Sequence, residues 1–242
     1  MSFTKITVLV DDLNGAEEDY VLSYGFAALI EQENKKILFD AGTKPGPLMH
    51  NLDLYGISVS SLDAVILSHN HYDHTDGLPG LLERRNDLPI YIHKDWDKPA
   101  SFKGYKIPKD NRVIVKEPGA LDEISPNIMV TTSFLSPDYG GVYEHACYIK
   151  TEESYILICG CCHPGLNRFL EDRTNLDIAL DAPLHILGGM HGFYFKDREA
   201  KDLEPFLKSI ILFHCTMKGS IFKEQFGSKC KIGKVGKTET FK

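Results

Sequence analysis

Five short apolar runs in this sequence each end in a histidine or an aspartate. The runs KKILFD, LDAVILSH and SIILFH end at Asp40, His69 and His214, while SYILICGCCH and LHILGGMH end at His163 and His191. Short apolar runs bounded by turn residues are typical of buried strands. Open α/β sheets bind ligands beyond the carboxyl ends of their strands, so we expect these five side chains to meet in one cleft.

The remaining periodicity predicts a single α/β domain whose helices cover the faces of its sheets. Strands are predicted at residues 6–10, 26–31, 36–39, 64–67, 90–92, 113–115, 128–131, 146–150, 155–159, 184–187 and 210–213, and helices at 47–55, 79–85, 164–172, 198–207 and 219–226. No repeat or linker divides residues 1–242. Residues 94–127, rich in Lys, Asp, Pro and Gly, are predicted to be an irregular insertion that could form a rim or lid.

Charge and composition exclude several classes of protein. A net charge of −7 argues against nucleic-acid binding, which needs clustered basic side chains. The lysine-rich final stretch, KEQFGSKCKIGKVGKTETFK, is instead predicted to form solvated edge strands. The chain begins in a strand rather than a signal peptide, lacks an apolar span of roughly 20 residues and has no paired cysteine spacing. We therefore expect a reduced, cytoplasmic protein without a nucleic-acid or membrane partner.

The stretch HNHYDH carries the strongest chemical signal. It places His69, His71 and His74 within six positions, with Asp73 between the last two. Neutral imidazole and carboxylate are good ligands for zinc and similar ions, with bonds of about 2.0–2.2 Å. Packing alone gives no reason to gather four groups that are costly to desolvate. The stretch therefore predicts a metal site.

HNHYDH resembles the signature of the metallo-β-lactamase superfamily, and SYGFAALIEQENKKILFDAG resembles that superfamily's strand pair ending in a buried Asp-x-Gly. The motifs ICGCCHPG, ILGGMHGF and FHCT resemble a subgroup typified by the archaeal dihydropterin-ribofuranosylaminobenzene-phosphate synthases. The resemblance covers nearly the whole chain. It implies a four-layer αββα sandwich that binds one or two divalent metal ions.

Position by position, the resemblance assigns a role to most of these residues. It implies a first ion held by His69, His71 and His163, and a second held by Asp73, His74 and His214. Asp40 matches the buried aspartate that orients a ligand through a hydrogen bond. His191 matches no usual ligand; we expect it to line the substrate pocket and to donate a proton to an anionic or leaving group, with a structural role beside the Gly-Gly turn as the alternative.

The sequence departs from the superfamily where a bridging aspartate usually follows a glycine, because Cys161 follows Gly160 here. Glu144 or His145 could fill the missing ligand position. Cys161 or Cys162 could also bind as a thiolate, although an ordinary buried thiol is the expectation for both. His163 follows so closely that one segment could serve where the superfamily uses two.

These features predict a metal-dependent hydrolase. A bound ion lowers the pKa of water from 15.7 to about 7 and polarises the bond under attack, and Asp73 would ligate the ion and accept a hydrogen bond from the hydroxide. Esters, lactones, amides and phosphates are all possible substrates, and the subgroup implies a small, anionic, pterin-related molecule. Zinc is the expected metal, with manganese or iron as alternatives. The sequence leaves the substrate and the oligomeric state open.

Two other functions compete with the hydrolase. A non-catalytic metal-binding sensor would have a closed coordination sphere. A diiron redox enzyme on the same scaffold would resemble flavodiiron proteins, which have glutamate where this chain has His71 and which carry a flavin-binding segment that is not visible here.

Overall fold

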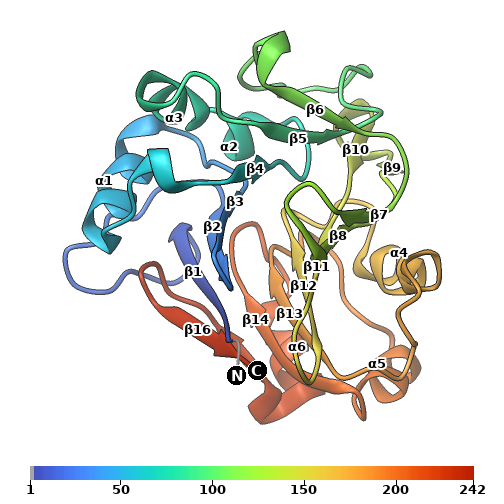
Figure 1. Ribbon diagram of the computed structural model, residues 1–242. Helices are drawn as coiled ribbons and strands as arrows, with labels where there is room; N and C mark the ends of the chain where they lie inside the picture. Colours follow the sequence, from blue (N-terminus) through green and yellow to red (C-terminus); the bar gives the residue numbers. More distant parts are fainter. Residues whose placement is uncertain (1–2) are drawn as a thin grey trace.

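Two seven-stranded β-sheets form the centre of the protein, whose computed structural model describes residues 3–242 (Figure 1). The first sheet has the strand order β16 (Thr238–Phe241), β1 (Thr4–Val10), β2 (Ala27–Gln32), β3 (Lys35–Phe39), β4 (Ala64–Ile66), β5 (Ile90–His93) and β6 (Arg112–Val115). The second has the order β15 (Cys230–Ile232), β14 (Leu207–Leu212), β13 (Leu184–Gly188), β12 (Tyr155–Cys159), β11 (Cys147–Lys150), β8 (Ser125–Val130) and β7 (Gly119–Leu121). A separate hairpin pairs β9 (Phe134–Ser136) with β10 (Val142–Glu144).

Both faces of each sheet are buried, which explains why the central strands are apolar throughout. Successive side chains of a strand point to opposite faces. In β3, Ile37 and Phe39 lie in the core between the sheets, whereas Leu38 lies in the core beneath the helices of the first sheet. In β12, Ile158 lies between the sheets and Leu157 packs under the helices of the second. Strands buried on both sides need apolar residues at every position.

Helices form the two outer layers (Figure 1). The outer face of the first sheet is covered by α1 (Pro45–Tyr55) and α3 (Leu78–Arg84), and that of the second by α4 (Leu166–Glu171), α5 (Asp197–Leu203) and α6 (Gly219–Phe226). Their apolar side chains, such as Leu48 of α1 and Phe222 of α6, are fully buried. The predicted four-layer αββα sandwich is confirmed.

Most predicted elements are present, with two corrections. The helix predicted at 198–207 ends at Leu203, because Pro205 has no N–H to donate to the preceding turn. Residues 94–127 are irregular only in part, since β6 and β7 lie within them as edge strands of the two sheets. The lysine-rich final stretch does contain two edge strands, β15 and β16.

Parallel pairing decides where the strand ends meet. The strands β3, β4, β5 and β6 are parallel neighbours in one sheet, as are β12, β13, β14 and β15 in the other. The carboxyl ends of parallel strands lie at the same edge of a sheet, so the residues that follow them gather there. No helix in residues 3–242 is both long enough and apolar enough to cross a bilayer.

Candidate metal centre

The structure brings the ends of three parallel strands, β4, β12 and β14, together around two groups of possible ligands. One group contains His69, His71 and His163; the other contains Asp73, His74, Cys161 and His214. Within each group the ligand atoms lie within 4.8 Å of one another. The sequence predicted these two sets of residues, apart from Cys161. The short helix α2 (Tyr72–Thr75) sets Asp73 and His74 one after the other on its first turns.

Three imidazoles of the first group surround a common point. Nε2 of His69 lies 3.2 Å from Nδ1 of His71. Two nitrogens bound to one tetrahedral ion at about 2.05 Å would be about 3.3 Å apart, so this separation suits a shared ion. The third member, His163, has a buried Nε2 without a hydrogen-bond partner in residues 3–242. Because buried polar atoms are normally paired, this nitrogen is suited to a cation.

Hydrogen bonds behind His69 determine which of its nitrogens carries the proton. The Ser68 hydroxyl has a single proton and lies 2.7 Å from the Asp40 carboxylate, which can only accept. Ser68 Oγ is therefore the acceptor for Nδ1 of His69, 2.9 Å away. With Nδ1 protonated, the lone pair of His69 is on Nε2, the nitrogen that faces the group.

The second group is arranged in the same way. Nδ1 of His74 donates to Asp40 at 2.7 Å, and Nδ1 of His214 donates to Asp12 at 2.6 Å. The inward Nε2 atoms then face the other ligands: that of His74 lies 3.1 Å from the thiol of Cys161, and that of His214 lies 3.1 Å from Asp73. Such outer carboxylates are the partners that metal-binding histidines commonly have.

Asp40 links the two groups. Its buried carboxylate accepts hydrogen bonds from the backbone N–H and hydroxyl of Ser68 and from Nδ1 of His74, each at 2.7 Å. It therefore orients one histidine in each group, the role predicted for it. Gly160 makes this approach possible, because a Cβ there would lie 2.1 Å from Ser68 Oγ and 2.9 Å from the Asp40 carboxylate.

Burial and neighbouring charges give the two groups different electrostatics. Burial, followed by the charges of adjacent imidazoles, lowers the pKa of His69 well below its ordinary value and that of His163 to about 2. Burial also lowers the pKa of His214, but Asp12 and Asp73 outweigh it and raise that pKa to about 10. The first group is thus a set of neutral imidazoles, the form that binds metal. The second carries a charge pair in the absence of an ion.

Glu144 supports the loop that supplies both groups. Its fully buried carboxylate accepts hydrogen bonds from the backbone N–H groups of Cys161, Cys162 and His163, at 2.9, 2.8 and 2.7 Å. Nε2 of His145 bonds to a backbone carbonyl instead. Neither Glu144 nor His145 belongs to a ligand group, so the alternative that one of them fills the missing ligand position finds no support in the geometry.

Of the two cysteines, only Cys161 lies where it could take that position. Its buried thiol belongs to the second group, whereas Cys162 packs in the core beneath the helices. Burial raises the pKa of Cys161 well above its ordinary value, and a bound cation would favour its thiolate. As expected, one segment serves both groups, through Cys161 and His163.

Two residues of the centre escaped sequence reasoning. Asp12 follows the end of β1, so the rule that identified Asp40 and His69 applies to it as well. Asp138, whose carboxylate lies 3.4 Å from Nδ1 of His163 and 3.9 Å from Nε2 of His191, lies in the turn between β9 and β10. No local pattern distinguishes it from other turn aspartates.

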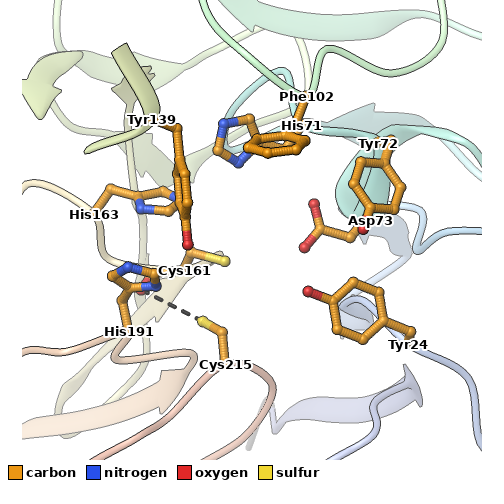
Figure 2. A pocket seen from close by; sticks show the side chains of 10 residues that line it. All are labelled: Tyr24, His71, Tyr72, Asp73, Phe102, Tyr139, Cys161, His163, His191 and Cys215. Carbon is orange, nitrogen blue, oxygen red and sulfur yellow. Dashed lines mark hydrogen bonds between the residues drawn. The ribbon is translucent and has the colours of Figure 1, made fainter. Parts of the chain in front are cut away.

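A pocket of about 490 Å³ opens over both groups (Figure 2). Its lining residues are Tyr24, His71, Tyr72, Asp73, Phe102, Tyr139, Cys161, His163, His191 and Cys215. As predicted, His191 lines it. Four of these residues, Phe102, Tyr139, His191 and Cys215, have positive φ angles between 40° and 57°. Such conformations are costly for residues other than glycine and cluster at functional sites.

Replacing Cys161 by serine should selectively weaken the second metal position. The loss in affinity should exceed the roughly 10–100-fold that removal of an outer hydrogen-bond partner costs, because a ligand is lost. In the cobalt-loaded protein, the near-ultraviolet charge-transfer band of a thiolate–cobalt bond should disappear. The matched control is Cys215→Ser, which alters a pocket thiol that belongs to neither group. If the charge-transfer band were still present in Cys161→Ser but absent in Cys215→Ser, the assignment of Cys161 as a ligand would be wrong.

Comparisons with known proteins identify the family and the fold. Residues 21–138 match the family model described as the metallo-beta-lactamase superfamily. An uncharacterised protein of Methanocaldococcus jannaschii is 31% identical over 96% of this chain and 98% of its own length. The 7,8-dihydropterin-6-methyl-4-(beta-D-ribofuranosyl)-aminobenzene-5'-phosphate synthase of the same organism is 27% identical over 92% of this chain and 91% of its own. A crystal structure described as a metal-dependent hydrolase of the beta-lactamase superfamily shares the fold, with a TM-score of 0.73, 20% identity and 98% of both chains covered.

Proposed function

This chain belongs to the metallo-β-lactamase superfamily, and on that premise we propose that it is a metal-dependent hydrolase of a small molecule. The bond cleaved is an ester, lactone, amide or phosphate bond. The observation that carries the proposal is the pair of adjacent ligand groups beneath one solvent-open pocket. A sensor that only held metal would need no such opening above its ligands.

The residues present fit one or two divalent ions. The first group offers three imidazole nitrogens, and the second offers a carboxylate, two imidazoles and a thiol. Zinc suits this set best because it accepts nitrogen, oxygen and sulfur ligands together, whereas manganese prefers oxygen; manganese and iron are the alternatives. When bound, such ions make water more acidic and polarise the bond under attack.

Asp73 is the candidate proton acceptor among the chain's own groups. Burial raises its pKa, but the neighbouring His74 and His214 outweigh this and hold the pKa well below the ordinary value. Its carboxylate is therefore ionised at neutral pH and is directed into the pocket (Figure 2). It can hold an attacking water by accepting its hydrogen bond.

His191 is the candidate proton donor. A hydrogen bond with Cys215 raises its pKa above the ordinary value, against the opposing effect of burial. Its ring lies on the pocket wall with its centroid 4.6 Å from that of His163. A protonated imidazole at that place can donate to the leaving group as the bond breaks.

The substrate is a small molecule in this proposal, and we take an anionic, pterin-related compound as its finer form. Support comes from the M. jannaschii synthase whose name describes a dihydropterin phosphate, because its match extends along nearly all of both chains. The motifs around His163, His191 and His214 carry the same resemblance.

The test is hydrolysis by the zinc-loaded protein of a panel of neutral esters, lactones and bis(4-nitrophenyl) phosphate. We expect turnover of at least one compound class and its loss in His214→Ala, which removes a ligand of the second group. The control is His50→Ala, because His50 is exposed and bonds only to the Asp19 carbonyl. Turnover that persists in His214→Ala, or no turnover of any class, would count against a hydrolase that uses both groups.

A further inference from the structure

Four aromatic rings line opposite walls of the pocket. We name Tyr24, Tyr72, Phe102 and Tyr139 the aromatic clamp. Figure 2 shows Tyr139 on one side of the open centre, Tyr24 and Tyr72 on the other, and Phe102 at the top beside His71. The candidate ligands His71, Asp73, Cys161 and His163 line the same cavity. A molecule bound over the ligands would therefore lie beside these rings.

The first wall is built from two strained aromatic residues. The rings of Phe102 and Tyr139 meet edge to face, with centroids 5.3 Å apart and an interplanar angle of 89°. Both residues have positive φ angles, of 57° and 52°, which side chains of this size rarely adopt. A backbone hydrogen bond from Ser101 to Tyr139 links the two segments. Strain of this kind persists where the position of a side chain matters.

Both rings of this wall are also left in contact with solvent. Phe102 is 57% exposed and Tyr139 is 47% exposed. Large apolar surface that stays exposed around a pocket commonly marks a binding site. The structure thus places two rings at a cost in backbone strain and leaves their surfaces free for a ligand.

The second wall presents two stacked tyrosines. The rings of Tyr24 and Tyr72 have centroids 6.2 Å apart and are inclined by 28°. Tyr24 is 48% exposed, and its ring packs edge-on against His214, with centroids 4.9 Å apart. The contact with His214 fixes Tyr24 beside the second ligand group, and its hydroxyl points toward the open centre (Figure 2).

Apart from histidines, the described pocket walls provide no basic side chain. Within residues 3–242, neither lysine nor arginine lines the pocket. Lys103 forms a backbone bridge to His71, but its ammonium donates to the Asp97 carbonyl, away from the cavity. Any negative charge on a ligand must therefore be met at the metal centre or by His191. The rest of the ligand meets aromatic faces, which bind best to another π-system.

We propose that the substrate carries a planar aromatic or heteroaromatic ring next to the scissile bond, and that the aromatic clamp holds this ring. The inference rests on the proposed hydrolase function, but it comes from the pocket walls and not from the names of relatives. The rings and the candidate ligands line one continuous pocket, so a ring held by the clamp lies next to the bond presented to the metal centre.

Three hydroxamates test the clamp without requiring turnover. Acetohydroxamate, cyclohexanecarbohydroxamate and benzohydroxamate share one metal-chelating group and differ in the part that would enter the clamp. Their affinities for the zinc-loaded full chain are measured by calorimetry. We expect benzohydroxamate to bind about 3- to 10-fold more tightly than the cyclohexane compound, the ratio that aromatic pairing adds beyond area burial.

Two variants and a matched control locate the effect. Tyr139→Leu and Phe102→Leu should each reduce the ratio toward one, because leucine offers no aromatic face. Tyr139 also packs against His71 and His163, so acetohydroxamate, which has no ring, reports any change at the metal centre that affects all three compounds alike. Tyr194→Leu makes the same change at a tyrosine that is 51% exposed and outside the pocket lining, and it should leave the ratio unchanged.

A ratio of benzohydroxamate to cyclohexanecarbohydroxamate affinity near one in the wild type, or a ratio unaffected by both variants, would overturn the clamp and leave the metal centre standing. Absence of zinc-dependent binding by all three compounds would overturn the proposed function and the clamp with it.

Discussion

Replacing His69 and His71 together by alanine should remove one equivalent of metal and abolish turnover while the chain stays folded. Both imidazoles belong to the first ligand group, and their facing nitrogens lie 3.2 Å apart. An ion that lost two of its three protein ligands would not be retained. Loss of about 4 kcal/mol of Lewis-acid stabilisation corresponds to a decrease in turnover of roughly 10³-fold.

The fold should survive because both imidazoles, although buried, lie outside the apolar clusters that hold the sheets and helices together. Burial and mutual repulsion keep the pKa values of both below their ordinary range, and the apolar layers on either side remain intact. Metal content is measured by elemental analysis and folding by circular dichroism. The control variant His50→Ala/His185→Ala removes two histidines outside both ligand groups. Unchanged metal content in the His69/His71 variant would refute the first group as a metal site.

Glu144→Ala should destabilise the protein by at least about 3 kcal/mol, because three buried N–H groups lose their shared acceptor and each unpaired group costs about 1–3 kcal/mol. For a chain of this size the melting temperature should fall by roughly 10 °C. The N–H groups concerned are those of Cys161, Cys162 and His163. Since this loop supplies a ligand to each group, both metal positions should weaken together.

Two comparison variants distinguish the effect of losing the hydrogen bonds of Glu144 from the effect of losing a carboxylate charge. Glu144→Gln keeps one accepting oxygen and should show a smaller loss. Glu152→Ala removes an exposed carboxylate near the turn between β11 and β12 and should behave as wild type. Urea and thermal unfolding give the free energies, and elemental analysis gives the metal content. Stability equal to that of Glu152→Ala would show that the loop does not depend on this carboxylate.

The members of the two ligand groups could be predicted where neighbouring residues in the sequence identify them. The stretch HNHYDH contains four of the seven possible ligands of the two groups. They are close together in the sequence because two histidines at the end of a strand are followed at once by a helical turn. His163 and His214 were identifiable because each follows an apolar run that could only be a buried strand. Cys161 was harder to recognise, because a cysteine beside a strand is most often core, and only its 3.1 Å contact with His74 distinguishes it from Cys162.

Three side chains that support the ligand groups act through contacts with residues elsewhere in the chain. A local sequence pattern does not indicate such contacts. Asp12 reaches His214 across 202 positions, Asp138 lies beside His163 and His191 only because of the β9–β10 hairpin, and Glu144 accepts from a loop 17 to 19 residues later. Likewise, the aromatic clamp combines single rings from four separate segments.

By itself the sequence determined a single α/β domain and a metal site at HNHYDH, because apolar periodicity and the chemistry of imidazole and carboxylate act over a few neighbouring positions; the four layers and the full ligand sets came from the resemblance to a known superfamily. Tertiary structure alone decided which nitrogen of each histidine faces inward, what holds the Cys161–His163 loop and which rings border the pocket. These properties follow from hydrogen bonds and packing between strands of two different sheets. Their geometry exists only after the sheets have closed on each other.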